Sequence, residues 1–279
     1  MEPTIVKKER TALQIMLSQE NVVSQFNRVL GEAAPAFIAS IADVGMTMPD
    51  VARFNPSTII SSALIAATLK LPINKSLGFA WIIPYGKGQN AKAQFQVGYK
   101  GFIQLAQRTG QYKSMNLLHV YKNQFKSWSA LTETFEGNLD LEPEGTRPVG
   151  FLFYFELISG FRKTIYKTRE ALIAHGKKYS KAFNSDDGTW RKDPDAMCAK
   201  TLISEGLRKW GPMSTEISRA LRADQAVVMG TDFDNDEAFV YVDNDHEQRK
   251  EISTDPAPLS FGADTSQEPL PFQDDDHAK

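Results

Sequence analysis

The chain has 279 residues, of which 42% are hydrophobic and 24% are charged, and its formal net charge is −2. This composition excludes wholesale disorder, no apolar run reaches the roughly 18 residues of a membrane span, and the length allows one large domain or two small ones. A single cysteine, Cys198, excludes a disulfide framework and a cysteine-rich metal site.

The first part of the chain shows the apolar spacing of helices. Residues 9–30 predict one helix, and residues 36–41 predict the start of another that ends near residue 45. Asn55 followed by Pro56 is typical of a helix start, because asparagine caps the first turn and proline fits its first position. Apolar residues at steps of three and four then predict a helix over 56–70.

Two strand-like runs follow, residues 79–85 and 91–97, and the glycine-rich polar segment between them predicts a β-hairpin. The second run alternates, so that Lys92, Gln94 and Gln96 lie on one face and apolar residues on the other. We therefore expect this hairpin to present a polar, basic face.

The remaining elements mix strands and helices. A helix is predicted over 99–109, a short one from Thr168 to His175, a longer one over 194–209 and a last one over about 214–228. The strand-like segments between the first two of these helices cover residues 112–122, 125–135, 149–158 and 161–167. The pattern predicts an α+β fold with N-terminal helices, a β-hairpin and antiparallel sheet, and C-terminal helices around one core.

The small net charge conceals a strong segregation along the chain. Residues 232–279 hold 14 acidic and 3 basic residues, whereas residues 1–231 hold 20 acidic and 29 basic ones. No acid occurs between Asp50 and Glu133, where ten lysines and arginines lie, and residues 157–185 hold seven bases and a single acid. A surface that contacts phosphates excludes carboxylates because they repel the backbone, so the pattern favours nucleic-acid binding over a merely solvated basic face.

Motifs that would indicate an enzyme are absent or incomplete. There is no Walker-type phosphate loop, and the glycine-rich segment 86–91 precedes an alternating strand with no acid nearby to hold a ribose. The acidic run from Asp232 starts like a calcium loop but has Glu237 where glycine is needed. The four histidines and Cys198 lack metal-ligand spacing. We expect a binding protein with no catalytic residue, cofactor or metal and, since no apolar leader opens the chain, a cytoplasmic one.

Two segments carry a more specific signal. Residues 71–124 contain GYKGFIQLAQRTGQ, and residues 193–220 contain MCAKT followed by RKWGPMS. Together with the strands between them they resemble the phage RecT family of single-strand annealing proteins, which is distantly similar to the lambda Red beta protein. The resemblance covers roughly residues 30–225.

The resemblance implies a recombinase that coats single-stranded DNA and anneals it to a complementary strand without nucleotide hydrolysis. It also implies assembly into rings or helical filaments, a partner 5′→3′ exonuclease, the host single-strand-binding protein as a second partner, and a phage or prophage origin in a bacterial cytoplasm. On this basis we divide the chain into an N-terminal helical segment that is a candidate subunit contact (1–30), a DNA-binding annealing core (31–230) and an acidic, largely disordered tail (231–279) that restrains DNA binding or docks a partner.

Candidate DNA-binding residues come from the matching blocks and from charge. The blocks carry over the phosphate contacts Lys75, Lys100, Lys200, Arg208 and Lys209. Charge and proximity add Lys92, Arg108, Lys178, Arg191 and Lys192. Lys200 and Arg208 fall within about 80° of each other on one predicted helix, so they are expected to line one groove. The polar residues Gln94 and Gln96 share the hairpin face with Lys92, and the candidates for stacking on bases are Tyr99, Phe102, Trp190 and Trp210. The alternative for each is a surface lysine that serves solubility or an aromatic in the core.

Three other functions remain open from the residues alone. A passive coat would protect single-stranded DNA without pairing it. A metal-dependent nuclease would use the carboxylates between Asp232 and Asp243. A structural assembly protein would bind DNA only incidentally.

Overall fold

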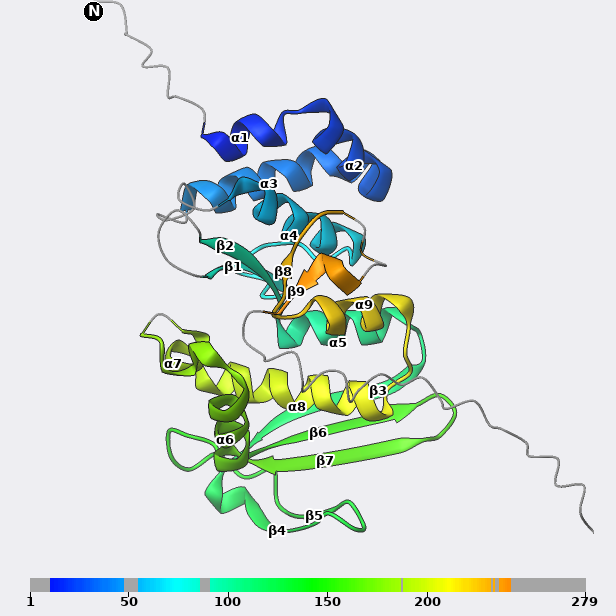
Figure 1. Ribbon diagram of the computed structural model, residues 1–279. Helices are drawn as coiled ribbons and strands as arrows, with labels where there is room; N and C mark the ends of the chain where they lie inside the picture. Colours follow the sequence, from blue (N-terminus) through cyan, green and yellow to red (C-terminus); the bar gives the residue numbers. More distant parts are fainter. Residues whose placement is uncertain are drawn as a thin grey trace, which may run out of the picture. The chain divides into compact units, whose positions relative to one another are not determined.

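The computed structural model describes residues 11–47, 55–85, 91–186, 188–231, 233 and 236–241 (Figure 1). All of these belong to the first of two units, residues 1–245 and 246–279. Groups of helices and antiparallel sheets follow one another along the described residues, which confirms the α+β prediction.

The N-terminal helices are α1 (Ala12–Leu17), α2 (Glu20–Leu30), α3 (Ala34–Thr47) and α4 (Pro56–Thr68). The single helix expected over 9–30 is therefore wrong, because the chain turns between α1 and α2. At that turn the Ser18 hydroxyl donates to the carbonyl of Ile15 over 2.7 Å, a local bond of the kind that competes with helix continuation. The start of α4 is as predicted, with the Asn55 side chain accepting from the Ser57 amide.

Helix α4 is buried along most of its length and packs against a hairpin of β1 (Ala80–Tyr85) and β2 (Lys92–Val97). The Ala93 amide donates to the hydroxyl of Thr58 on α4 over 2.9 Å, and Phe95 and Val97 are fully buried on the same side of the hairpin. The hairpin prediction is confirmed, while its tip lies outside the described residues.

Helix α5 (Tyr99–Arg108) leads into a second β region. Strands β3 (Tyr112–Val120), β6 (Gly150–Leu157) and β7 (Arg162–Thr168) form an antiparallel sheet in the order β3-β6-β7. The predicted strand over 125–135 is instead a hairpin of β4 (Phe125–Ser129) and β5 (Thr134–Gly137). Its aromatic rings pack on the sheet, where Phe125 stacks on Tyr166 with the ring centroids 5.0 Å apart.

The C-terminal elements are α6 (Arg169–Tyr179), α7 (Thr189–Lys192), α8 (Pro194–Trp210), α9 (Thr215–Ala223), β8 (Val227–Val228) and β9 (Phe239–Val240). Helix α8 lies along β6 and β7, with α6 and α7 at its N-terminal end (Figure 1). The helix predicted over 214–228 ends early because residues 226–228 join β2 and β9. Phe239 is only 4% exposed, so the core includes residues beyond 231, where the sequence placed the start of the tail.

Candidate nucleic-acid interface

One face of the β1–β2 hairpin carries polar and aromatic side chains from both strands. In the antiparallel register Trp81 lies opposite Gln96, and Ile83 lies opposite Gln94. Because side chains alternate between faces, Trp81 and Gln96 share the face that points away from α4, and both are half-buried, as is Lys92. Sequence reasoning missed Trp81, although the alternation of the first strand and the cross-strand register would have found it.

Two glycines bring a lysine-bearing turn and the start of α5 to this face. A Cβ on Gly98 would lie 2.1 Å from the carbonyl oxygen of Gly78, so only glycine allows this approach. A Cβ on Gly78 would lie 3.8 Å from both the Lys100 side chain and the Trp81 ring. Helix α5 has no acid in its first turn and no side-chain cap, so the positive end of its dipole adds to the lysine charge.

The exposed or half-buried residues of this region are treated together below as the hairpin surface: Lys75, Trp81, Lys92, Gln96 and Lys100. Four of the five were predicted from the sequence. Lys75 lies in the turn that ends at Gly78, whose amide donates to the carbonyl of Asn74 over 3.0 Å. The turn therefore holds Lys75 close to the hairpin and to the first turn of α5.

A second basic surface lies where α6 and α7 pack at the N-terminal end of α8. Four exposed basic side chains define this α6–α7 surface: Lys177, Lys178, Arg191 and Lys192. Trp190 fixes α7, because it is only 7% exposed and its ring lies 2.5 Å from the position that a Cβ on Gly176 would occupy. Arg191 also forms an ion pair with Asp186.

Acids on neighbouring strands and on more distant segments pair with other bases of the two acid-poor stretches. Lys113 contacts Glu156 over 2.9 Å, and this hydrogen bond is the main reason that the pKa of Glu156 lies below its usual value. The further pairs are Lys126 with Glu136, Arg162 with Glu156, Lys163 with Glu133, Lys167 with Glu205 and Arg169 with Asp195. The second acid-poor stretch, residues 157–185, therefore offers a nucleic acid less unpaired positive charge than the sequence pattern suggests.

Lys200 does not lie where the sequence places it. The residue is 6% exposed, and its ammonium contacts the carboxylate of Asp224 over 2.8 Å. An ammonium that is buried and paired does not reach a phosphate, so the prediction of a phosphate contact needs correction. Arg208 on the same helix is exposed, so the two residues do not present their side chains to solvent together as the predicted groove requires.

Gln94 and Arg108 also make hydrogen bonds that stabilise the fold. Gln94 is 2% exposed: its side-chain amide donates to the carbonyl of Gln225, and its side-chain oxygen accepts from the Gln96 amide over 3.0 Å, so it lies on the face of Gln96 but is buried there. The Arg108 guanidinium donates to the carbonyls of Leu69 and Lys70 over 2.8 and 2.9 Å. It thus satisfies carbonyls at the C-terminal end of α4, which are left without partners inside the helix.

The predicted residues at the end of α8 lie apart from the α6–α7 surface. Arg208, Lys209 and Trp210 come 14 to 16 positions after Pro194, so they lie about 21–24 Å along the helix from the α7 end. Trp210 is 46% exposed, and the Lys163 ammonium lies 3.5 Å from its ring centroid. An exposed ring leaves Trp210 as a stacking candidate.

The other aromatic candidates are more buried. Phe102 is fully buried in the core, and Trp190 packs against Phe183 with the ring centroids 5.6 Å apart. The stacking predictions for these two residues do not fit the structure, because their rings already have protein neighbours. Tyr99 is half-buried at the start of α5, beside the hairpin surface.

Some features of the described residues bear on metal and thiol chemistry. Within this part of the chain no three histidine, cysteine or acidic residues gather as a metal would require. Burial raises the pKa of the Cys198 thiol to about 12, which leaves it an unreactive core residue. Asp232, Asp234 and Asp243, which the nuclease alternative needs, lie outside the described residues. None of the described helices has the length and apolar character to span a membrane.

Comparison with known proteins gives matches over most of the chain. The model of the RecT family matches residues 37–241. The uncharacterized protein YqaK of Bacillus subtilis (strain 168) is 45% identical over 217 residues, which cover 77% of this chain and 73% of that protein. The protein RecT of Escherichia coli (strain K12) is 29% identical over 189 residues, which cover 64% of this chain and 66% of that protein.

Proposed function

Because the chain belongs to the RecT family of DNA-annealing recombination proteins, we propose that it binds single-stranded DNA on the hairpin and α6–α7 surfaces and pairs it with a complementary strand without ATP. One observation carries the proposal. Lysines of the acid-free stretch 51–132 gather around the hairpin and the start of α5, next to a tryptophan.

Elementary energetics supports a reaction that needs no nucleotide. Stacking in duplex DNA contributes about 1.4 kcal/mol per base step, so pairing itself drives the exchange. The protein has to bring two polyanions together, and lysines that displace counterions from the phosphates do this. Annealing must accept any sequence, so we expect contacts to phosphates and to base faces rather than to base edges.

Sequential addition of two complementary oligonucleotides tests the proposal. The protein is mixed with the first strand and then with a fluorescent complement, with EDTA present and ATP absent, and pairing is followed over time. We expect faster pairing than in the protein-free reaction. Tight binding of the first strand with slower pairing would instead identify a passive coat.

The same assay separates the nuclease alternative. Cleavage that appears with magnesium and is lost on replacing Asp232 and Asp234 by asparagine would establish a nuclease. We expect intact oligonucleotides with and without magnesium, because these carboxylates lie outside the two matching blocks, residues 71–124 and 193–220.

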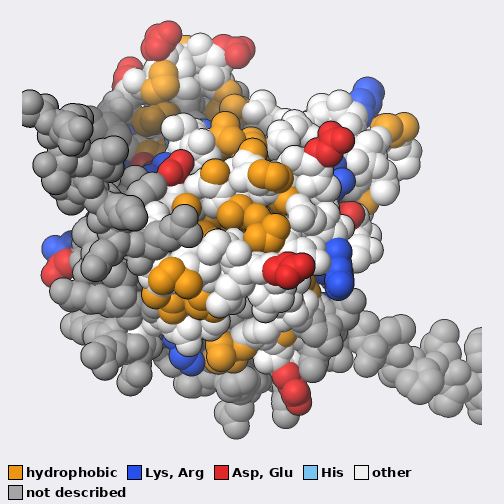
Figure 2. Space-filling view, turned by 90° about the horizontal axis from the view of Figure 1, so that it is seen from above, with side chains coloured by type: hydrophobic (Ala, Val, Ile, Leu, Met, Phe, Trp, Pro, Cys, Tyr) orange, Lys and Arg blue, Asp and Glu red, His pale blue; other side chains and the backbone are white. Residues whose placement is uncertain are grey.

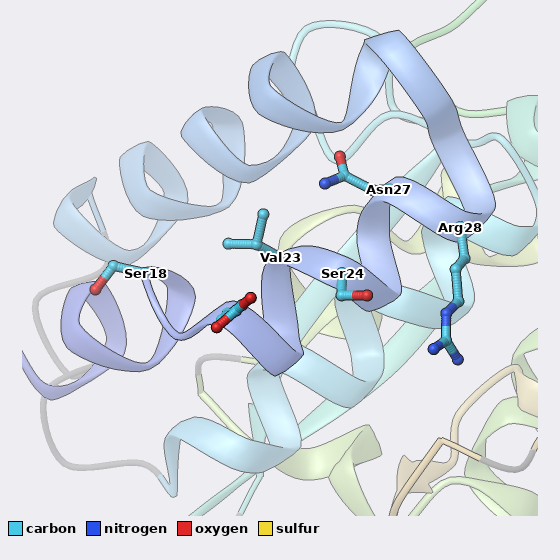
Figure 3. Close-up of a pocket in the computed structure, with 6 residues that line it drawn as sticks. Ser18, Val23, Ser24, Asn27 and Arg28 are labelled. Carbon is cyan, nitrogen blue, oxygen red and sulfur yellow. The ribbon is translucent and has the colours of Figure 1, made fainter.

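We further propose that the protein acts as an oligomer through its N-terminal helices. Apolar side chains gather over the α1–α3 end of the unit (Figure 2), and Ile15 of α1 is 52% exposed. A mainly polar depression in the same helical segment is lined by Ser18 and, on α2, by Glu20, Val23, Ser24, Asn27 and Arg28 (Figure 3). A second copy that covers this face would remove apolar surface from water.

Sedimentation velocity, with and without DNA, tests this contact. We expect Ile15→Asp to reduce the size of the assembled species. The matched control is Leu131→Asp, because Leu131 is 95% exposed in the β4–β5 turn and its replacement should leave assembly unchanged. Assembly of the Ile15 variant to the wild-type size would refute this surface as the subunit contact.

The proposed partners are a 5′→3′ exonuclease that produces the single strand and the host single-strand-binding protein. The protein would encounter both on DNA in the bacterial cytoplasm. The acidic residues after 245 are their proposed docking segment, and they lie outside the described residues. Deletion of 245–279 should leave oligonucleotide annealing intact. Loss of annealing in the truncated protein would refute a merely regulatory or docking role.

A further inference from the structure

Three elements of the fold meet at one buried carboxylate. Asp224 directly follows α9, and its Oδ1 atom accepts from the Lys200 ammonium of α8 and from the Val97 amide of β2, each over 2.8 Å. The side chains of Lys200 and Asp224 are only 7% and 12% exposed. The ion pair therefore joins α8 to the end of the hairpin through the residue that ends α9.

We call the contact of Lys200, Asp224 and Val97 the joint. Backbone hydrogen bonds extend it along β2. The Gln225 amide donates to the carbonyl of Phe95, and the Phe95 amide donates to the carbonyl of Ala226, each over 2.9 Å. The side-chain amide of Gln94 donates to the carbonyl of Gln225. Residues 224–226 are thus bound to β2 along their length, and Lys200 is the charged group that ties α8 to them.

The joint lies between the two basic surfaces. Val97 directly precedes Gly98, the cap of α5, so it stands two and three residues before Tyr99 and Lys100. Lys200 lies six residues after Pro194, about 9 Å from the α7 end of α8. A DNA strand that contacts both surfaces requires a constant spacing between them. A spacing that is already fixed in the free protein lowers the free-energy cost of binding.

We propose that Lys200 is a positioning residue: it neutralises Asp224 and thereby holds the hairpin surface and the α6–α7 surface in one arrangement for single-stranded DNA. This inference rests on the proposed function. Lys200 does not contact phosphate itself, since doing so would break the pair and leave the Asp224 carboxylate buried and uncompensated, which is strongly unfavourable.

Salt dependence distinguishes positioning from phosphate contact. A phosphate contact on single-stranded DNA contributes about 0.7 to the slope of log affinity against log salt. We expect Lys200→Met to weaken oligonucleotide binding by roughly tenfold or more at every salt concentration without changing the slope, since unpairing Asp224 disturbs the joint. The matched control is Lys100→Met, an exposed lysine of the hairpin surface, which should lower the slope by about 0.7.

A double variant completes the test. In Lys200→Met with Asp224→Asn, the asparagine oxygen still accepts from the Val97 amide and no charge is left buried, so we expect both affinity and slope to return close to wild type. If the single variant does not fold, the double variant carries the test alone. A slope lowered by about 0.7 in either variant, or unchanged affinity in a folded Lys200→Met protein, would overturn the inference.

Thermal unfolding without DNA separates this inference from the proposed function. Lys200→Met should lower the melting temperature, and the added Asp224→Asn should restore most of the loss. If wild-type protein binds no single-stranded DNA, the proposed function fails while this recovery still supports the joint. A double variant that melts as low as the single one would refute the joint itself.

Discussion

The close approach of Gly98 to Gly78 makes Gly98→Ala an informative perturbation. Gly98 has φ −76° and ψ 160°, a conformation open to alanine, so any effect comes from contact and not from backbone strain. The added Cβ would lie 2.1 Å from the Gly78 carbonyl oxygen and 3.3 Å from the Trp81 Nε1 atom. Ordinary contact begins at 3.4 Å, so the Gly78 turn has to move by about 1.3 Å.

The loss of folding stability caused by this displacement can be estimated. Overpacking costs about 1–3 kcal/mol, and we expect the upper half of that range because the obstructing atom belongs to the backbone. For a chain of this size each kcal/mol corresponds to about 2–4 °C, so the melting temperature should fall by about 4–12 °C. The turn that carries Lys75 would also move away from Lys100, and single-stranded DNA affinity should fall with it.

Thermal unfolding by circular dichroism and oligonucleotide titration measure the two effects. The control is Gly110→Ala, where a Cβ meets nothing within 4 Å but φ is +67°. That variant should lose only the roughly 1 kcal/mol expected from backbone strain and keep its DNA affinity. A Gly98→Ala protein that melts within about 2 °C of wild type would show that the packing argument is wrong.

Three further predictions follow from named contacts. Replacing Lys75, Lys92 and Lys100 together by methionine should lower the slope of log affinity against log salt by about 2, and an unchanged slope in oligonucleotide titrations would place the DNA elsewhere. Arg108→Met should destabilise the protein by about 1–2 kcal/mol in urea unfolding, because two carbonyls at the end of α4 lose their donor, while a lowered salt slope would mean that Arg108 does contact phosphate. With a pKa of about 12 the Cys198 thiol carries only about one part in 10⁴ thiolate at pH 8. It should therefore react with a disulfide reagent only as the protein unfolds, and rapid reaction of native protein would contradict its burial.

Local signals predicted the elements that depend on local chemistry. Asn55 and Thr168 accept from amides of the helices that they precede, and Asp193 does the same at the start of α8, because capping requires only residues two or three positions away. Strand alternation likewise predicted the buried and polar faces of β2, apart from Gln94.

Elements that depend on distant partners were not predictable from local patterns. The run over 214–228 has helical spacing, but Val227 and Val228 pair with β9, and Ala226 pairs with Phe95. Helix α7 has only four residues and exists because Trp190 packs against Gly176 and Phe183. Neither contact leaves a signal in the neighbouring sequence.

The sequence by itself determined the family, through its two matching blocks, and the segregation of charge, through composition alone. It could not determine which bases face outward, because ion pairing and burial depend on residues far along the chain. Lys200 meets Asp224 across 24 residues, and Lys167 meets Glu205 across 38. Lys75 and Lys100 stay exposed beside two glycines that allow backbones to approach. Tertiary packing alone decided that Lys200, a lysine from a matching block, joins two elements whereas Lys75 and Lys100 remain on the surface. Only folding brings a carboxylate within reach of one ammonium and not of another.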